Sequence, residues 1–271
     1  QIHREAGNRR SEGDVRGNLG SMYARQGKLE EAEPHLQAAS HITREIGDRY
    51  GEGMVLNNLG VFYQNQGRHD ASEQHYLRAL RIHCEVGNRR GEGMVLGNLG
   101  ALYRLQGQAT KAGENFHRAL RIHREVGNRR SEGYVLGSLG LLQDSQGHTE
   151  QAMACFDDAI DIAREVGSRA LEGTCLAEVG RLLTKQMRLE PAIENLKAGE
   201  VLLREVNHLL ELGRLLCYRA RAEHLAHHPD NADAALARAR QIAADLHAGP
   251  DAELTRYIRE VQDILPGDGP A

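Results

Sequence analysis

The sequence is poor in residues that mark several common protein classes. It has no tryptophan, only 3 phenylalanines and 6 prolines, against 30 glycines in 271 residues. Its 4 cysteines lie far apart and form no Cys-x-x-Cys pair, which argues against a disulfide framework and favours a reducing cytoplasm. No apolar run approaches the roughly 20 residues of a membrane-spanning helix, and Gln1 opens no signal-peptide pattern. We therefore expect no membrane association.

Excess charge of one sign is also missing. The formal net charge of −4 is small for this length, whereas a general nucleic-acid binder needs a concentrated basic surface to displace counterions from phosphates. No nucleic-acid partner is expected.

Recognisable catalytic chemistry is absent as well. The recurring Gly-Asn-Leu-Gly lies within a predicted helix, whereas a nucleotide-binding loop requires a strand-to-helix turn. Although Cys84 directly follows His83, we expect no cysteine to be a nucleophile. We expect no enzyme and no cofactor.

What the sequence does contain is a segment that recurs at a fixed interval. Five related units open at glycines 40 residues apart, at positions 7, 47, 87, 127 and 167. A sixth, from Asn207, keeps the length but loses the glycines. Such self-similarity indicates a repeat architecture, in which units stack because none can bury its apolar face alone.

Each unit has the pattern of two helices. In the third unit the first helix carries one apolar face at three- and four-residue spacing: Val95, Leu96, Leu99, Leu102 and Tyr103. The second helix carries another: Ala112, Phe116, Ala119, Leu120 and Val126. Gly107 and Gly127 are predicted to end the two helices with a positive φ, and Asn128 to cap the next helix.

These positions resemble the signature of the tetratricopeptide repeat, Trp-x2-Leu-Gly-x2-Tyr, then Ala-x3-Phe and a later Ala. The third unit supplies the matching residues: Leu96, Leu99, Gly100, Tyr103, Ala112, Phe116 and Ala119. Leu stands in the place of Trp, the closing Pro is missing, and each unit exceeds the usual length of about 34 residues. The longer unit is similar to the repeats of LGN/Pins spindle-orientation adaptors, kinesin light chain and the sensor arms of bacterial signalling proteins.

The resemblance implies an all-α fold, a right-handed α-solenoid of stacked antiparallel helix pairs. Residues 1–6 would be the end of a preceding unit's second helix, so we expect the chain to be a fragment of a longer array. The predicted divisions are five units at 7–46, 47–86, 87–126, 127–166 and 167–206, a degenerate unit at 207–246, and a capping helix and tail at 247–271. The polar outer face of that capping helix is predicted to contain Arg256, Arg259, Glu260 and Asp263.

In the resembling family the first helix of each unit lines a concave groove, and an Asn before the core Leu-Gly bonds the backbone of an extended peptide. This carries over to one row of candidate peptide-binding residues: Asn18, Asn57, Asn58, Asn98, Ser138 and Glu178. An amide both donates and accepts, so it suits a peptide group. The alternative is that these side chains bond a neighbouring helix or face water.

A second row of the same groove is apolar where LGN-type repeats often place Arg. It contains Met54, Met94 and Tyr134, joined by Val61, Ala101 and Leu141 one position after the core Gly. We predict a hydrophobic floor for an apolar or amphipathic segment. Packing between adjacent helices is the alternative. The implied groove also includes Arg104 and Arg181.

Two further patterns have simpler explanations. The linker arginines (Arg9 and Arg10, Arg89 and Arg90, Arg129 and Arg130) form either a basic ridge or, with neighbouring glutamates, ladders of ion pairs, which we favour. For the histidines at 224, 227 and 228, a solvated loop is favoured over a metal site.

The leading hypothesis is therefore a module that binds a peptide or protein segment in its groove. The alternatives are a ligand-sensing arm of a larger signalling protein, and a scaffold that self-associates through open repeat ends. The sequence upstream of this segment would test the sensor hypothesis, because a nucleotide-binding, kinase or protease domain there would favour it. Mass measurement over a range of protein concentrations would test the scaffold hypothesis.

Overall fold

The computed structural model describes residues 2–25, 27–250 and 252–264, without the side chains of 2–7 and 25. Within these residues all regular structure is helical. The first helices of the repeats are α1 (Ile2–Arg25), α3 (Arg49–Asn65), α5 (Arg89–Leu105), α7 (Arg129–Ser145), α9 (Arg169–Lys185) and α11 (Leu209–Leu225). The second helices are α2 (Leu29–Glu45), α4 (His69–Glu85), α6 (Ala109–Glu125), α8 (Thr149–Glu165), α10 (Leu189–Glu205) and α12 (Pro229–Asp245), and α13 (Glu253–Gln262) follows.

Glycines and caps set the helix ends where the repeat predicts them. Gly107 and Gly127 have φ of 72° and 64°, the left-handed conformation that glycine adopts without strain. Asn88 accepts a hydrogen bond from the backbone N–H of Gly91 at 3.0 Å, and Asn128 accepts one from Ser131 at 3.3 Å. Both amides thus cap the following helix, as predicted for Asn128.

Within a repeat, the two helices approach closely because a glycine faces an aromatic ring. A Cβ atom added at Gly100 would lie 2.6 Å from the ring of Phe116, and one at Gly60 would lie 2.4 Å from Tyr76. Both rings are almost completely buried. The Leu-Gly and Ala-x3-Phe parts of the signature are therefore two sides of one contact.

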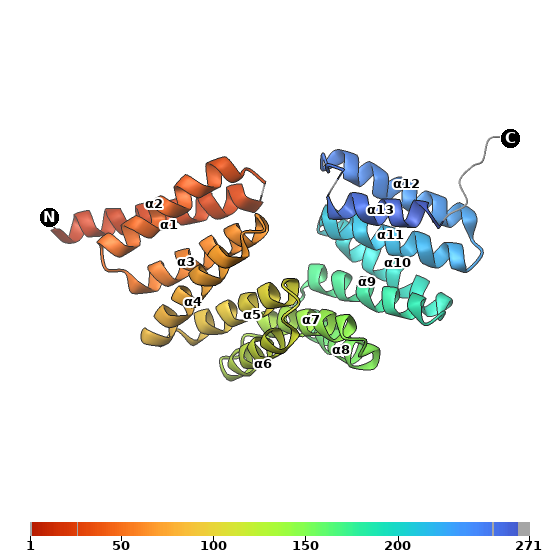
Figure 1. The fold of residues 1–271 in the computed structure, drawn as a ribbon, viewed down its shortest axis with the longest axis horizontal. Coiled ribbons are helices and arrows are strands. Elements are labelled where there is room, and N and C mark those ends of the chain that lie inside the picture. Colours follow the sequence, from red (N-terminus) through yellow and green to blue (C-terminus); the bar gives the residue numbers. More distant parts are fainter. Residues whose placement is uncertain (1, 26, 251, 265–271) are drawn as a thin grey trace. The chain divides into compact units, whose positions relative to one another are not determined.

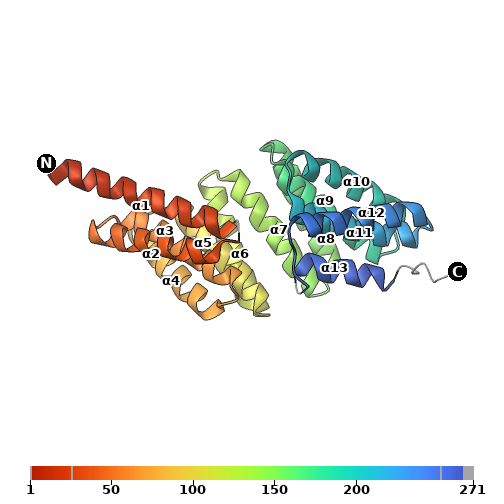
Figure 2. The same ribbon diagram turned by 90° about the horizontal axis from the view of Figure 1, so that it is seen from above.

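The chain divides into two compact units, Gln1–Val135 and Leu136–Ala271, and each is described by itself. In the first unit, α1 packs on α2, α3 on α4 and α5 on α6, and α3 also contacts its neighbouring first helices α1 and α5 (Figures 1 and 2). In the second unit, α9 packs on α10 and α11 on α12, and α13 covers α11 and α12. The prediction of an all-α fold of stacked helix pairs is confirmed.

Helix α1 runs through Gly7 without a break, and the division between residues 6 and 7 stays a prediction. One local expectation is wrong. Val126 is only half-buried, since it occupies the C-cap of α6 and not its apolar face.

The last helix has the two faces expected of a cap. Leu254, Ile258 and Val261 are buried in the core of the second unit. Arg256, Arg259, Glu260 and Asp263 are exposed, as predicted. Among the helices of the described residues, none is long and apolar enough to cross a membrane.

Candidate functional site

A stripe of incompletely buried apolar side chains runs along the first helices of the first unit. Four of its members were predicted on α3 and α5, namely Met54, Val61, Met94 and Ala101, and a fifth, Tyr134, lies on α7. Val61 and Tyr134 are exposed by 36% and 48%, so these two are not core residues. We call these residues, together with Tyr50 and Leu105, the α3/α5 stripe.

Tyr50 and Leu105 were missed by the sequence reasoning, although each is about half exposed at 53% and 54%. Their spacing along the helix could have identified these two residues from the sequence. Tyr50 lies one turn before Met54, and Leu105 one turn after Ala101, on the same side of the helix. Exposed large apolar side chains that share a face in this way mark an interaction surface more often than isolated ones do.

Asparagines lie beside the stripe and are partly used within the stack. The side-chain amide of Asn98 donates a hydrogen bond to the side-chain oxygen of Asn57 at 2.8 Å, joining α5 to α3. Asn57 is buried, Asn58 is half-buried and Asn18 is exposed. Asn98 retains its amide oxygen and its second hydrogen for a further bond. The alternative role as a helix–helix contact therefore applies to Asn57 and in part to Asn98, while Asn18, Asn58 and the unused groups of Asn98 remain candidates for a partner's backbone.

In the second unit the equivalent positions carry charges that neutralise each other. Arg181 on α9 donates to Asp144 on α7 and to Glu178, each at 2.7 Å, and Arg214 on α11 lies 3.3 Å from Glu178. Burial alone would raise the pKa of Asp144, but hydrogen bonds and charge from Arg181 and Lys185 lower it overall. Glu178 is 2% exposed, so its carboxylate is not accessible to a peptide in this arrangement.

The remaining predicted residues are half-buried. Ser138 and Leu141 lie on the part of α7 that belongs to the second unit, and Arg104 lies near the end of α5. The α3/α5 stripe is therefore limited to residues of the first unit, and Leu141 stays a prediction.

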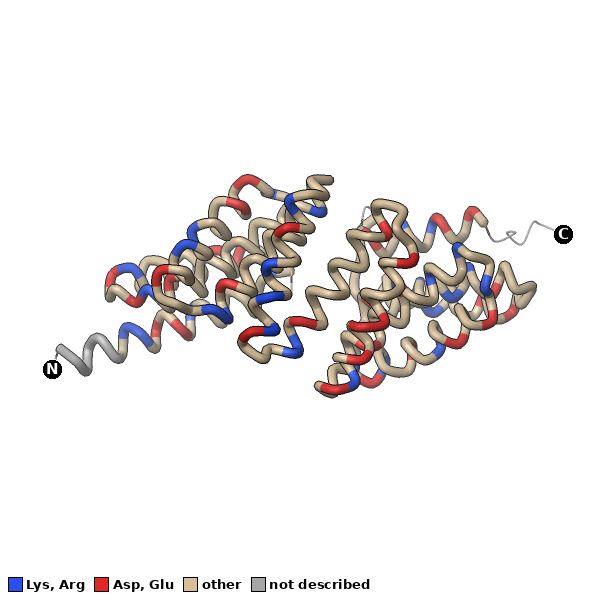
Figure 3. Tube along the Cα trace, turned by 90° about the horizontal axis from the view of Figure 1, so that it is seen from below, with Lys and Arg blue, Asp and Glu red and all other residues tan. Residues whose placement is uncertain are grey.

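The linker arginines divide into two groups. The first Arg of each pair lies in an ion-pair ladder, as favoured from the sequence: Arg9 contacts Glu12 and Glu45, each at 2.6 Å, and Arg89 contacts Glu92 at 2.6 Å and also Glu125. Basic and acidic residues are interspersed along the backbone of both units (Figure 3).

The second Arg of each pair behaves differently. Arg10 lies 2.9 Å from Asp48, the capping residue of α3. Arg90 and Arg130 are exposed, and no ion pair is found for either among the described residues. The sequence reasoning had treated both arginines of each linker alike.

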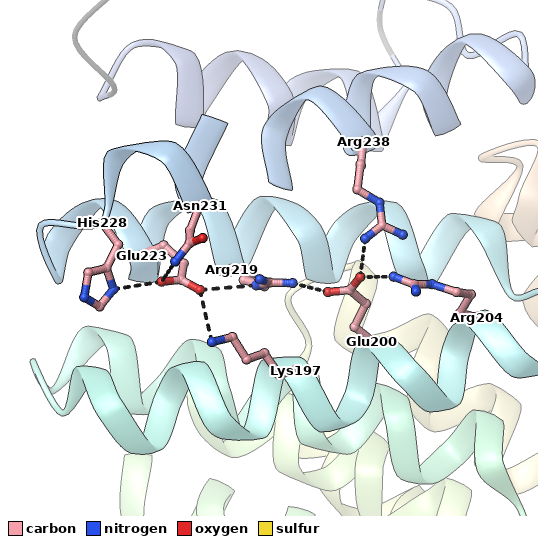
Figure 4. Close-up of polar contacts among 8 residues, drawn as sticks. All are labelled: Lys197, Glu200, Arg204, Arg219, Glu223, His228, Asn231 and Arg238. Atoms are coloured by element: carbon pink, nitrogen blue, oxygen red, sulfur yellow. Dashed lines mark hydrogen bonds and ion pairs between the residues drawn. The ribbon is translucent and has the colours of Figure 1, made fainter. Parts of the chain in front are cut away.

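A second set of charges lies between α10, α11 and α12 (Figure 4). Glu200 pairs with Arg204, with Arg219 and, at 2.6 Å, with Arg238. Arg219 continues to Glu223 at 3.4 Å, and the Glu223 carboxylate also accepts from Asn231. Nearly all of both carboxylates is buried, so these pairs hold three helices together and do not form an open site.

The histidines offer no metal site in the described residues. His228 lies 3.0 Å from Glu223, and no group of three or more His, Cys, Asp or Glu side chains converges. His83 and His123 are buried at the ends of α4 and α6, and burial lowers the pKa of each.

Comparison with known proteins agrees with this architecture. A sequence profile described as tetratricopeptide repeat matches residues 11–86 and 91–165. No curated protein sequence matches the chain.

Several solved structures share the fold at low sequence identity. The apo form of RapI is 13% identical with a TM-score of 0.70, covering 88% of this chain and 85% of RapI. Kinesin light chain nearly identical TPR-like repeats of Podosopora anserina are 15% identical with a TM-score of 0.54, covering 72% of this chain and 96% of theirs.

The third comparison is with a signal transduction ATPase of Pyrococcus horikoshii that has a tetratricopeptide repeat sensor. It is 16% identical with a TM-score of 0.67, and the match covers 95% of this chain and 39% of that protein. The profile match, the spacing of the repeats and the glycine–aromatic contact agree: the chain belongs to the tetratricopeptide repeat family.

Proposed function

We propose that this chain is a protein-interaction module, not an enzyme, and that the α3/α5 stripe binds a largely apolar segment of a partner protein. The observation that carries the proposal is the row of exposed apolar side chains on neighbouring first helices, from Tyr50 to Tyr134. Exposing them to water is unfavourable, and covering them releases about 25 cal/mol per Å² of apolar surface. The asparagines beside the stripe supply bonds to the partner's backbone.

The second unit has a different part in this proposal. Its charges at Asp144, Glu178, Arg181 and Arg214 are already paired, so a peptide would have to break those pairs to bind there. Breaking a buried pair by removing one partner costs about 3–5 kcal/mol. Binding is therefore assigned to the first unit.

The test is capture of partners by a series of single variants. Leu105→Asp and Met94→Asp place a charge on the stripe and should abolish capture, while circular dichroism and the melting temperature keep their wild-type values. The matched control is Leu77→Asp, because Leu77 is an exposed apolar residue on the second helix α4 and should not contact the partner.

One outcome would reassign Met94 to the core, and another would overturn the proposal. If Met94→Asp alone unfolds the chain, Met94 is core packing, and Leu105→Asp then decides the matter. If Leu105→Asp captures partners as well as Leu77→Asp does, the stripe is not the binding face.

A second candidate function is self-association. On α1, Val15 and Met22 are exposed by 56% and 43%, whereas Val55 and Phe62, their equivalents on α3, are buried. An uncovered repeat face of this kind favours docking of another helix pair. Sedimentation at increasing protein concentration tests it: Val15→Asp should prevent any dimer that forms.

The sensor alternative is supported by the similarity in fold to the archaeal ATPase with a repeat sensor, of which this chain covers 39%. We also propose a reducing compartment, the cytoplasm, because the four cysteines are free thiols.

A further inference from the structure

We propose that the partner segment carries acidic side chains next to its apolar ones, and that Arg90 and Arg130 bind them. This inference rests on the proposed binding function of the α3/α5 stripe and adds the chemistry of the partner.

The two arginines lie at the edge of the stripe. Arg90 is four residues before Met94, and Arg130 is four residues before Tyr134, so each shares a helix face with a stripe residue. Both arginine side chains are exposed. Neighbouring packed helices lie about 8–10 Å apart, so one extended segment crossing both helices would reach both guanidinium groups.

Among the described residues these two arginines have no carboxylate partner, and the cause can be identified in the repeat. Arg10 is the equivalent residue of the first repeat, and it pairs with Asp48, the residue that caps α3. The residue equivalent to Asp48 is Asn128 for Arg90, and Ser168 for Arg130. Asn128 still caps α7, because an amide oxygen accepts the same hydrogen bond, but it has no negative charge.

The nearby carboxylates do not replace that missing charge. Glu92 is buried and lies 2.6 Å from Arg89, and Glu132 is buried and lies 2.5 Å from Arg129. Glu92 and Glu132 are thus already paired with the first arginine of each linker. Arg90 and Arg130 therefore keep an unneutralised positive charge beside the apolar stripe. Charge complementarity then favours an acidic partner. The planar guanidinium group of arginine can also donate two parallel hydrogen bonds to one carboxylate.

The experiment selects from a random library of 12-residue peptides displayed on phage. The wild-type chain should enrich peptides that combine large apolar residues with Asp or Glu. The charge-reversed variant Arg90→Glu/Arg130→Glu should lose the acidic enrichment and keep the apolar one. Its matched control is Arg78→Glu/Arg118→Glu, which changes the net charge equally at exposed positions of α4 and α6 and should select as the wild type does.

Synthetic copies of the most enriched peptide then give the magnitude by fluorescence anisotropy. We expect Kd to rise about 3- to 30-fold in Arg90→Glu/Arg130→Glu, as for two exposed ion pairs lost. The difference should shrink in high salt, where exposed charges are screened. Circular dichroism confirms that both double variants are folded.

The outcomes separate this inference from the function on which it rests. Apolar enrichment without acids, or acidic enrichment that survives Arg90→Glu/Arg130→Glu, would overturn the charge inference and leave the binding module intact. If the wild type enriches no peptide, or if Leu105→Asp enriches the same peptides, the binding function itself fails, and this inference with it.

Discussion

Single glycines decide how closely the helices of a repeat approach. Gly60, Gly100 and Gly140 face Tyr76, Phe116 and Phe156, and in each case an added Cβ would come within 2.4–2.8 Å of the ring. Gly97, on the same helix as Gly100, has no such neighbour: the nearest atom to an added Cβ, in Val135, would be 3.4 Å away. The role of a glycine therefore follows from what it faces, and not from its helix.

This difference predicts opposite effects of two alanine substitutions in α5. Gly100→Ala should destabilise the chain by about 1–3 kcal/mol, because the Phe116 ring has no room to move away. Gly97→Ala should be neutral or stabilise it by up to about 1 kcal/mol, because it removes the entropy cost of a mid-helix glycine. Urea unfolding of both variants measures the free energies, and equal effects would contradict the packing explanation.

Buried histidines make stability depend on pH. Burial lowers the pKa of His83 and His123 in the folded chain, although Glu92 and Glu132 oppose the shift and Arg90 adds to it at His123. The unfolded chain, with an ordinary pKa of about 6.5, binds more protons, so stability is full above that pH and is lost as the pH falls through it.

We therefore expect the free energy of unfolding to drop between pH 7.5 and pH 5, and His83→Thr/His123→Thr to reduce that drop. Threonine is the natural residue at the equivalent position 43. The exposed His117→Thr is the control and should leave the pH dependence unchanged. Denaturant titrations at both pH values make the comparison, and identical drops in the wild type and the double variant would refute it.

At the scale of helices, the contact between the fifth and sixth repeats replaces core leucines with charges. Glu200 on α10 is the equivalent of Leu120, and Arg219 on α11 is the equivalent of Leu139, and both leucines are buried. The same repeat geometry thus accommodates an ion-pair network between α10, α11 and α12 (Figure 4). Such a network is costly to break on one side, whereas apolar residues can replace it as a whole.

A double-mutant cycle tests this interpretation. Glu200→Leu should destabilise the chain by roughly 2–4 kcal/mol, because Arg204, Arg219 and Arg238 all lose a carboxylate. Glu200→Leu/Arg219→Leu should recover most of that loss, because it restores the apolar pair of the earlier repeats. Additive losses in thermal or urea unfolding would show that the two charges act independently.

At the scale of the whole molecule, stability is a sum over neighbouring helices, because each helix contacts mainly those next to it. The last helix pair would then leave an apolar face uncovered. Helix α13 covers this apolar face, because its residues Leu254, Ile258 and Val261 are buried in the cluster that also contains Cys217. Its outer face is polar, as predicted for a capping helix.

Cysteine reactivity can report on this cap. Cys217 is buried, and burial raises its pKa to about 12, whereas Cys84 is exposed. Ile258→Asp should undock α13 at a cost of about 2–5 kcal/mol, and the reaction of Cys217 with a thiol reagent should accelerate strongly. Cys84 should react as before, and the exposed substitution Gln262→Asp should change neither rate. Unchanged protection of Cys217 in Ile258→Asp would show that α13 is not the cover.

Much of the fold was predictable because the same sequence pattern occurs in several repeats. The interval between glycines, the Leu-Gly to aromatic pairing and the Asn caps recur in several units, so one local pattern specifies the helix pairs that carry it. Residues on the surface of a first helix were harder to interpret. The same row of the repeat holds Met94, half-buried in the stripe, and Arg214, engaged with Glu178.

The sequence by itself determined the family, the helix pairs and their apolar faces, because these depend on spacing along one chain. Only the tertiary structure decided which charges are already neutralised. Arg89 and Arg90 are adjacent and identical in type, yet Arg89 lies in a ladder with Glu92 and Glu125, whereas Arg90 forms no ion pair within the part of the chain that the structure describes. The reason is that an ion pair requires two groups within about 4 Å, and that distance is set by how neighbouring helices pack.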